Sequence, residues 1–376
     1  MVKYIWQRLN WNKFYWNEEI LLPRVSRVRL KQNKLIQKVQ SLINEDFKKA
    51  EAIIFEQEAL KTAQIEGERY NPESVRSSIN RRLGLDYAGL PRTERHIDGL
   101  VAVLFDATLN HDQPLTQERL FGWQAALFPT GFSGLTKIEA GKFRTDKKGP
   151  MQVISGAIGK EMVHFQAPEA GRIAAEMAGF LNWWPESRKA VDGILRAGIA
   201  HFYFITVHPF DDGNGRIARA LTDMALAQDD KLSRRYYSLS NEIVARRKQY
   251  YEVLEKAQKG DSDLNGWLMW FIDCFSAALE TADILLKDIF IKMKFWNKFR
   301  AVAINSRQRK VINRILDAGK GKFRGGLSTR KYIGITGASR RTAIREIQNL
   351  LSQEMLKQNP GKGRNVSYDI NWPKVL

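Results

Sequence analysis

A chain of 376 residues is too long for one compact core, and 44% apolar residues suffice to build two or three domains. The single cysteine, Cys274, excludes an intrachain disulfide and suits a reducing compartment, so we expect a cytoplasmic protein. The apolar stretch 266–279 is short and contains Asp273, and the first residues lack the apolar core of a signal peptide. We therefore expect neither secretion nor a membrane span.

The formal net charge of +19 favours an acidic partner such as a nucleic acid, a nucleotide or a membrane surface. Residues 301–376 carry 16 lysines and arginines against 4 acidic residues, a net charge of +12, which leaves +7 for the other 300 residues. A solvated basic surface is the simplest explanation of such an excess. The alternative is a nucleic-acid site in this segment.

Apolar residues recur at three- and four-residue steps along most of the chain, which predicts a mainly α-helical protein. The first informative helix is expected over about 45–67, with Gly67 as its stop. Its apolar face consists of Phe47, Ala50, Ile54 and Leu60. Between Pro150 and Pro168, the β-favouring runs 151–154 and 162–165 predict a hairpin. Two further helices are expected over about 191–205 and 216–228.

The most informative segment lies between those last two helices and reads His208-Pro209-Phe210-Asp211-Asp212-Gly213-Asn214-Gly215-Arg216-Ile217-Ala218-Arg219. Its Gly-Asn-Gly run permits a tight turn, and the N-terminus of the next helix attracts phosphate, as do Arg216 and Arg219. A carboxylate at Asp212 is compatible with phosphate if Mg²⁺ lies between them. His208 is suited to take a proton from an attacking hydroxyl at neutral pH. The combination predicts nucleophilic attack on a phosphorus atom.

These twelve residues resemble the signature of the Fic family, His-Pro-Phe-x-Asp/Glu-Gly-Asn-Gly-Arg-x-x-Arg, and match it at every specified position. The resemblance implies a protein adenylyltransferase, which cleaves ATP at its α-phosphate and places AMP on a Ser, Thr or Tyr hydroxyl of a target protein or of itself. It implies His208 as general base and Asp212 as Mg²⁺ ligand. The α-phosphate would lie on Gly213, Asn214 and Gly215, and the β- and γ-phosphates on Arg216 and Arg219.

Two neighbouring segments extend the resemblance. The run Gly141-Lys142-Phe143-Arg144 resembles a turn ahead of the Fic flap, and the hairpin of about 152–165 resembles that flap, which holds the target peptide as an added strand. An ordinary surface hairpin is the alternative. The run Arg247-Lys248-Gln249-Tyr250-Tyr251 resembles the helix that borders the adenine pocket. We therefore expect Tyr251 to contact adenine, although an aromatic pair on a helix is also typical of a core.

His201 lies seven residues before His208, nearly two helical turns, so both rings can share one face. A zinc pair is conceivable at this spacing. Because no third ligand is suitably placed, we expect His201 to be a packed or hydrogen-bonded helix residue.

The end of the early helix, Thr62-Ala63-Gln64-Ile65-Glu66-Gly67, resembles the inhibitory motif of the family, Ser/Thr-x-x-x-Glu-Gly/Asn. Thr62 and Glu66 are four residues apart, so the hydroxyl is expected to steady the carboxylate. By resemblance, Glu66 pairs with Arg219 and obstructs the γ-phosphate, which implies autoinhibition. The alternative is an exposed glutamate at a helix end. The region 4–16 also resembles a module often joined to Fic domains of this type.

The basic C-terminal segment looks like a winged helix-turn-helix. Its helices are expected over about 307–316, 328–333 and 339–351, followed by a turn at 358–364 between two short strands. In the last helix we expect Ile344, Ile347 and Leu351 to face inward and Arg340, Arg341 and Arg345 to remain outside. Such an arginine-bearing helix favours double-stranded DNA as partner, with protein interaction as the alternative.

The sequence therefore predicts a mainly α protein, with a helical Fic core that carries a hairpin flap and a C-terminal winged helix. The expected domains are an N-terminal helical module (1–90), the Fic core (91–260), a helical bridge (261–300) and the winged helix (301–376). Two other functions stay open: removal of AMP, with Glu66 activating water, and DNA-binding regulation, with nucleotide at the Fic site as a signal. A homodimer is also open.

Overall fold

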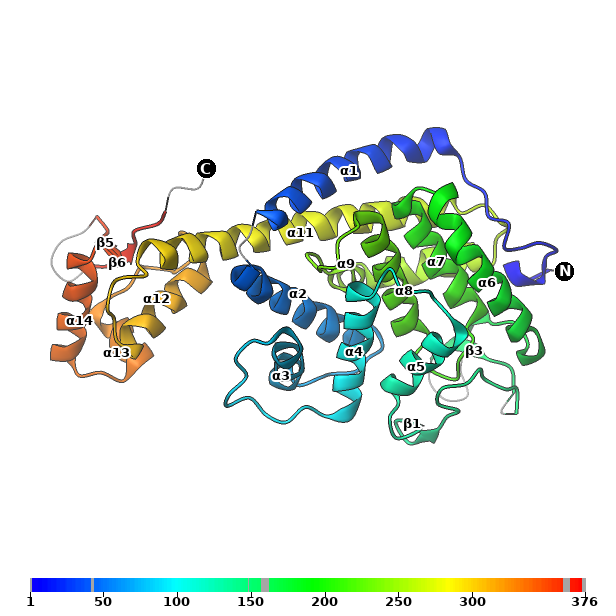
Figure 1. Ribbon diagram of the computed structural model, residues 1–376, viewed down its shortest axis with the longest axis horizontal. Coiled ribbons are helices and arrows are strands. Elements are labelled where there is room, and N and C mark those ends of the chain that lie inside the picture. Colours follow the sequence, from blue (N-terminus) through cyan, green and yellow to red (C-terminus); the bar gives the residue numbers. More distant parts are fainter. Residues whose placement is uncertain (1, 42–43, 148, 157–161, 361–365, 374–376) are drawn as a thin grey trace. The chain divides into compact units, whose positions relative to one another are not determined.

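The computed structural model describes residues 2–41, 44–147, 149–156, 162–360 and 366–373 (Figure 1). It confirms a mainly helical fold. The chain divides into two compact units, Met1–Ala282 and Asp283–Leu376. Within the described residues, no helix is both long and apolar enough to cross a membrane.

The first unit begins with a short 3₁₀ helix, η1, and five α-helices. Their bounds are η1 (Ile5–Gln7), α1 (Glu18–Gln40), α2 (Asn44–Ile65), α3 (Pro72–Leu83), α4 (Arg95–Leu109) and α5 (Gln117–Leu127). Helix α2 corresponds to the helix expected over 45–67, and Gly67 follows it with φ +83°. Of its expected apolar face, Phe47, Ala50 and Ile54 are buried, whereas Leu60 is only partly so.

The rest of the first unit contains the helices that form its core. They are α6 (Ala170–Ala190), α7 (Gly193–Val207), α8 (Asn214–Asp230), α9 (Leu239–Ala245) and α10 (Arg247–Gln258), followed by α11 (Asn265–Lys298). Every residue from Ile194 to Val207 is buried, as expected for a helix that is apolar all round. Asp192 caps α7 by accepting the N–H of Ile194 (2.9 Å). The segment between α7 and α8 carries the twelve-residue motif.

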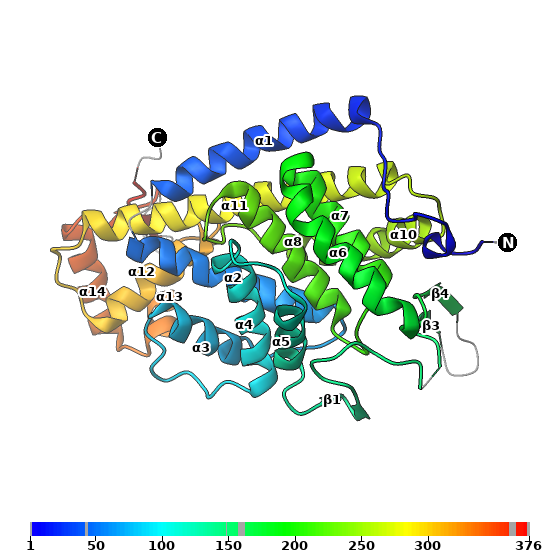
Figure 2. The same ribbon diagram turned by 45° about the vertical axis from the view of Figure 1, so that its right-hand side comes forward.

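Helix α1 runs along the first part of α11 (Figure 2). Arg24 pairs with Asp273 at 3.0 Å, and Lys31 donates to Ser276 Oγ at 2.8 Å. These contacts lie on the surface, where each ion pair contributes little to stability.

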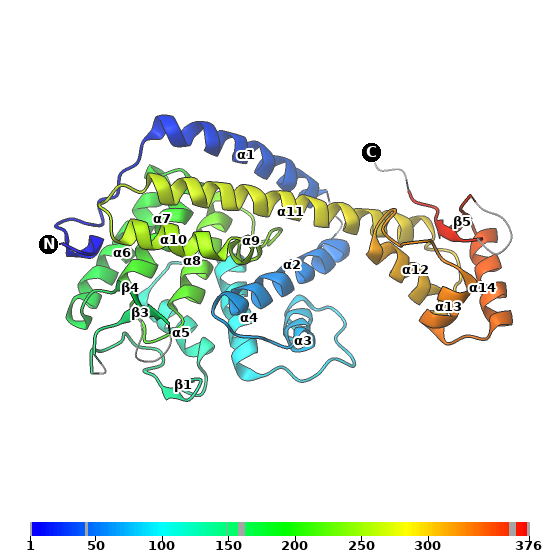
Figure 3. The same cartoon turned by 180° about the vertical axis from the view of Figure 1, so that it is seen from behind.

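The predicted hairpin is confirmed as the antiparallel pair β3 (Gln152–Ser155) and β4 (Met162–Gln166), while its turn at 157–161 lies outside the described residues. A smaller hairpin, β1 (Phe132–Ser133) and β2 (Thr136–Lys137), precedes it. Strand β4 lies beside α10 (Figure 3), because His164 Nδ1 contacts Glu255 Oε2 at 2.8 Å. On the same strand, the carbonyl of Gln166 accepts from Trp6 Nε1 at 2.6 Å. Strand β3 therefore forms the outer edge of the hairpin.

The described residues of the second unit form the end of α11, three further helices and a hairpin. The further elements are α12 (Ser306–Ala318), α13 (Thr329–Thr336), α14 (Arg340–Ser352), β5 (Leu356–Gln358) and β6 (Tyr368–Ile370). This order matches the elements expected for a winged helix-turn-helix, although residues 361–365 of the expected wing turn lie outside the described residues. Ser339 caps α14 by accepting the N–H of Thr342 (3.2 Å).

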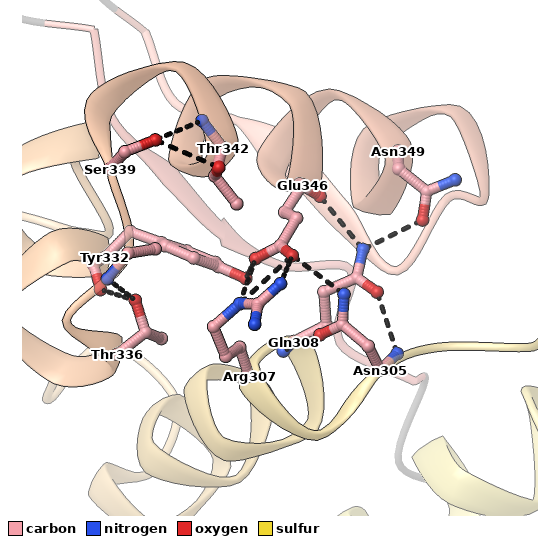
Figure 4. Close-up of polar contacts among 10 residues, drawn as sticks. Asn305, Arg307, Gln308, Tyr332, Thr336, Ser339, Thr342, Glu346 and Asn349 are labelled. Carbon is pink, nitrogen blue, oxygen red and sulfur yellow. Dashed lines mark hydrogen bonds and ion pairs between the residues drawn. The ribbon is translucent and has the colours of Figure 1, made fainter.

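A buried carboxylate ties the helices of the second unit together (Figure 4). Glu346 on α14 accepts hydrogen bonds from Tyr332 on α13 (2.6 Å) and from Asn305 ahead of α12 (2.8 Å). Arg307 on α12 also donates to it. The hydrogen bond from Arg307 lowers the pKa of Glu346 to about 2, against the opposing effect of burial. Glu346 therefore remains an ionised acceptor at neutral pH.

One sequence expectation about α14 is wrong. Ile344 does not face inward, because its side chain is 40% exposed. The buried face consists of Ala343, Ile347 and Leu350, at i, i+4 and i+7, so the helix is rotated from the expected orientation. Leu351 is only partly buried. Arg340, Arg341 and Arg345 are all exposed.

Helix α2 is anchored to the core by a buried ionic cluster. Arg235 pairs with Glu58 (3.0 Å) and with Asp223 (2.8 Å), and the three side chains are at most 3% exposed. Ser238 adds a hydrogen bond to Glu58 at 2.7 Å. The cluster fixes α2 against α8 and the segment before α9, and so fixes the end of α2 near the motif.

We predict that Arg235→Met lowers the free energy of unfolding by about 3–5 kcal/mol, because it leaves two buried carboxylates without their cation. The matched control is Arg76→Met. Arg76 is a partly exposed residue of α3 that pairs with Glu56 on α2, so its loss should lower the free energy of unfolding by less than about 1 kcal/mol. Chemical denaturation of both variants checks this. Equal losses would contradict the anchoring role of the cluster.

Candidate active site

The loop between α7 and α8 is closed by one side chain. Asn214 accepts the N–H of Phe210 (2.9 Å) and donates to the carbonyl of the same residue (2.7 Å). Its side chain therefore serves the loop itself. Within the described part of the chain, the backbone N–H groups of Asn214, Gly215 and Arg216 at the start of α8 have no hydrogen-bond acceptor and can receive an anion.

One glycine of the loop is required by its backbone conformation, and a second leaves room for the carboxylate of Glu66. Gly213 has φ +88°, and a Cβ there would lie 2.9 Å from the ring of Phe128. At Gly215 a Cβ would collide with the carboxylate of Glu66.

His208 ends α7 in a left-handed conformation with φ 51°. Its Nδ1 contacts the carbonyl of Ile205 at 3.2 Å. Because a carbonyl can only accept, Nδ1 carries the proton and Nε2 keeps its lone pair. Burial lowers the pKa of His208 to about 4; the hydrogen bond to Ile205 opposes this shift, and the charge of Arg144 adds to it. The imidazole is therefore neutral at neutral pH.

Arg144 holds the backbone on which His208 stands. Its Nε donates to the His208 carbonyl (2.8 Å), and its own N–H donates to the Pro209 carbonyl (2.9 Å). The guanidinium is buried and pairs with Asp146 at 3.0 Å. The sequence indicated only a turn at this position, and the bracing contact follows from tertiary structure.

Asp212 has both carboxylate oxygens engaged at the edge of the loop. Oδ1 accepts from the N–H of Gly213 (2.5 Å), and Oδ2 accepts from the hydroxyl of Ser133 on β1. Its side chain is 41% exposed. Among the described residues, no three His, Cys, Asp or Glu side chains are grouped as a metal site. A lone carboxylate beside a phosphate site still fits Mg²⁺, which takes its other ligands from substrate phosphates and water.

Both arginines of the motif are buried and engaged by one segment of chain, residues 62–70. Arg219 donates through Nε to the hydroxyl of Thr62 (2.6 Å) and through Nη2 to Glu66. Arg216 pairs with Glu68 at 3.2 Å. The expected contact between Glu66 and Arg219 is therefore present, while its inhibitory role stays a prediction.

One expectation about this segment needs correction. Thr62 was expected to steady the carboxylate of Glu66, but its hydroxyl accepts from Arg219 instead. Burial acts to raise the pKa of Glu66, yet the charge and hydrogen bond of Arg219 outweigh it and lower the pKa. Glu66 therefore stays ionised beside Arg219 at neutral pH.

Tyr251 lies on α10 near the end of α2. Arg247, one turn earlier, donates to the carbonyl of Ile65 (2.8 Å) and lies 5.7 Å from the centre of the Tyr251 ring. The ring is 39% exposed and so remains available to a ligand. Its contact with adenine stays a prediction.

His201 is confirmed as a hydrogen-bonded helix residue. Its Nδ1 contacts the hydroxyl of Thr222 at 3.0 Å and its Nε2 that of Tyr250 at 2.9 Å. Burial lowers its pKa to about 3. Both ring nitrogens are thus used within the core.

Sequence reasoning missed three side chains at the site: Ser133, Glu68 and Tyr70. Glu68 follows Glu66 by two residues, which was the one local signal for it. Ser133 lies in a different part of the sequence, and nothing in its surroundings marks it.

Two curated relatives match part of this chain. It is 36% identical to the protein adenylyltransferase fic-1 of Caenorhabditis briggsae over 125 residues, 33% of this chain and 21% of that protein. It is 30% identical to the protein adenylyltransferase Fic of Drosophila grimshawi over 114 residues, 30% of this chain and 22% of that protein. The chain thus spans about a fifth of the length of these relatives.

Two solved structures share the fold. A Fic family protein from Desulfovibrio desulfuricans G20 has a TM-score of 0.52 and 18% identity, over 93% of this chain and 96% of that chain. A Fic-domain-containing signaling protein from Bacteroides thetaiotaomicron VPI-5482 has a TM-score of 0.52 and 16% identity, over 70% of this chain and 97% of that chain. At these identities the likeness shows the fold alone.

Two family matches cover separate parts of the first unit. Residues 4–85 match a domain of unknown function (DUF4172), and this range includes residues 62–67 at the end of α2. Residues 114–226 match the Fic/DOC family, and this range includes the whole twelve-residue motif. The chain therefore contains a domain of the Fic/DOC family at residues 114–226.

Proposed function

We propose that this protein is an autoinhibited protein adenylyltransferase, which transfers AMP from ATP to Ser, Thr or Tyr hydroxyls of proteins, itself included. One observation carries the proposal: a neutral His208 with a free Nε2 stands beside a helix N-terminus that presents two buried arginines. The family match and the names of the relatives support the same reaction.

The geometry suits in-line attack on the α-phosphorus. His208 Nε2 takes the proton as the target oxygen bonds to phosphorus, the bond to the bridging oxygen breaks, and pyrophosphate leaves. The N–H groups of the first turn of α8 hold the α-phosphate, and Arg216 and Arg219 bind the other phosphates. Mg²⁺ at Asp212 neutralises charge on the phosphates when bound. The protein contributes positioning and charge neutralisation.

Strand β3 offers an edge for the target peptide. Among the described residues it pairs with β4 alone, so its outer backbone groups can accept an added strand. A cavity of about 320 Å³ lies between β3 and the motif, and its lining includes Ile154, Met151 and Asp211. The side chain of Ile154 is 55% exposed. An extended peptide on β3 would bring its hydroxyl toward His208.

We predict an unusually acidic limb in the pH profile of AMP transfer. His208 must be neutral to act, and its lowered pKa keeps it so until the pH falls through about 4. The kcat/KM of the free enzyme should therefore be half-maximal near that pH, with folding checked by circular dichroism. A limb centred on the ordinary imidazole value of about 6.5 would contradict the assignment.

His208→Ala should abolish transfer at all pH values while largely retaining ATP binding.

Autoinhibition follows from the contacts of Arg219. Its Nη2 donates to Glu66 and its Nε to Thr62, so a γ-phosphate must displace at least the carboxylate. Arg219 is only 2% exposed, and a charge-assisted bond in such a sheltered place is strong. The resting protein is therefore slow.

We predict that Glu66→Gly increases ATP affinity and AMP transfer by roughly tenfold or more, because it frees Arg219. The matched control is Gln64→Gly. Gln64 is an exposed residue in the last turn of α2, and its side chain accepts from Lys61 and not from Arg219. Incorporation of labelled AMP is measured at equal Mg²⁺. Equal labelling by wild type and Glu66→Gly would refute inhibition. If the protein also removes AMP with Glu66 activating water, Glu66→Gly should stop that reaction.

A second function is supported for the C-terminal unit, namely binding of double-stranded DNA by a winged helix. Arg340, Arg341 and Arg345 are exposed on α14, and within the described part of the chain none of them forms an ion pair. Residues 301–376 carry a net charge of +12. Basic charge on an exposed helix after a turn is typical of DNA recognition. DNA binding without AMP transfer would favour a regulator that senses nucleotide.

We predict that the full chain binds duplex DNA with strong salt dependence and that Arg340→Ala with Arg345→Ala reduces the salt slope by about 2. The control pair Lys320→Ala with Lys322→Ala removes the same charge from exposed positions after α12. Fluorescence anisotropy at several salt concentrations distinguishes the pairs. No affinity at low salt, or equal effects of both pairs, would exclude a recognition role for α14.

A further inference from the structure

Residues 4–16, ahead of α1, form a segment whose large aromatic side chains are buried in the first unit. The segment has little regular structure, namely η1 and an isolated bridge at Tyr15. The side chains of Tyr4, Trp6 and Trp11 are nevertheless buried. Aromatic side chains of this size each bury roughly 150–250 Å² and therefore dominate the packing of such a segment. We call residues 4–16 the N-terminal segment.

The first residues of the N-terminal segment hold the end of strand β4. Trp6 Nε1 donates to the carbonyl of Gln166 at 2.6 Å. The ring of Tyr4 packs edge-on against the buried ring of Phe165, with 5.3 Å between the ring centres. Helix η1 also lies beside α10, the helix that contacts β4 (Figure 3). The last two residues of β4 are therefore held from outside the hairpin.

The rest of the N-terminal segment is fixed to the helical core. Trp11 Nε1 donates to Glu176 on α6 (3.0 Å), and Asn12 Nδ2 donates to the hydroxyl of Tyr203 on α7 (2.8 Å). The N–H and the carbonyl of Tyr15 both bond to the loop ahead of α11 at 3.0 Å. The N-terminal segment thus connects the hairpin to α7, the helix that leads into the motif.

The position of β3 depends on β4. Gln152 pairs with Gln166, and Val153 pairs with Phe165, across the hairpin. A two-stranded hairpin is only marginally stable on its own in water. Contacts that fix Phe165 and Gln166 therefore also fix the first half of β3, the strand whose outer edge is proposed to receive the target peptide.

We propose that the N-terminal segment is a brace that positions the hairpin for the target protein, with Trp6 as its main positioning residue. The inference rests on the proposed function, which takes β3 as the strand to which the target peptide adds. The N-terminal segment and the end of α2 lie in the same matched domain of unknown function, residues 4–85. In the proposed reaction this domain therefore acts on both substrates, on ATP through Glu66 and on the target through Trp6.

The first test is hydrogen–deuterium exchange of the full chain, without ATP or target. Trp6→Phe retains a large ring but loses the N–H donor to Gln166. We expect the amides of 152–155 and 162–166 to exchange roughly twofold to tenfold faster, as for the loss of one hydrogen bond. The control is Trp123→Phe. Trp123 is as buried as Trp6, at 5% exposed, and its Nε1 donates to Asp106 on α4, so its loss should leave exchange of the hairpin unchanged.

The second test measures transfer of labelled AMP to the proteins of a cell lysate by the Glu66→Gly protein, over a range of lysate concentrations. Trp6→Phe should raise the lysate concentration that gives half-maximal labelling by roughly twofold to tenfold. The maximal rate and the calorimetric affinity for ATP should stay unchanged. A general loss of structure would instead lower the maximal rate and the ATP affinity as well.

Three outcomes would overturn the positioning role: unchanged exchange of the hairpin in Trp6→Phe, equal effects of Trp6→Phe and Trp123→Phe, or an unchanged half-maximal lysate concentration. Thermal unfolding verifies that each variant is folded. If Trp6→Phe does not fold, Tyr4→Leu provides the same test by removing the ring contact with Phe165. The exchange experiment uses neither ATP nor target, so its failure is distinct from failure of AMP transfer. Faster exchange in a protein that transfers no AMP would retain the contact with the hairpin but refute the reaction and, with it, the role in target docking.

Discussion

Two buried arginines at the start of α8 impose the main constraint on this site. Arg216 and Arg219 are 3% and 2% exposed, and buried cations require acceptors. The acceptors come from residues 62–70, far away in the sequence. Guanidinium groups also bind phosphate well, so in the proposed function the protein carboxylates and the nucleotide compete for these arginines. Stability of the resting state and binding of substrate are thereby linked.

This competition depends on how firmly α2 is held. Glu58 lies two turns before Glu66 and is fixed by Arg235 and Ser238, so the end of α2 cannot drift from α8 without exposing a buried cluster. The carboxylates at the end of the helix are less enclosed: side-chain exposure is 31% for Glu66 and 39% for Glu68. A rigid helix thus presents two movable carboxylates to two fixed arginines.

The surroundings of His208 set the pKa of its imidazole. An imidazole with a pKa of about 4 is neutral but weakly basic. Bound phosphates would add negative charge nearby and raise this pKa toward the range in which a general base works best. Arg144 contributes to the low value and braces the His208 backbone at the same time. In the proposed reaction, His208 is therefore positioned before the substrate binds and becomes a stronger base as the phosphates bind.

Local patterns predicted much of this architecture, and tertiary contacts account for the remainder. The hairpin and α2 are continuous in sequence, so periodicity was sufficient to predict them. The motif 208–219 is also continuous, and its resemblance to the Fic signature identified it. Ser133 contacts Asp212 and Arg144 contacts His208, and these residues lie far apart in the sequence. No local sequence pattern encodes such contacts. Periodicity was also insufficient to orient α14. Ile344 was expected on its buried face, but the smaller Ala343 is buried there and Ile344 is exposed.

The most direct measurement uses Glu66→Gly protein and two preparations of ATP, one labelled at the α-phosphate and one at the γ-phosphate. Adenylyl transfer retains only the α-phosphorus on the product. We predict that protein becomes labelled from α-labelled ATP, that γ-labelled ATP gives no label, and that His208→Ala in the same background removes the signal. Label from the γ-phosphate, or α-label that persists without His208, would contradict the account.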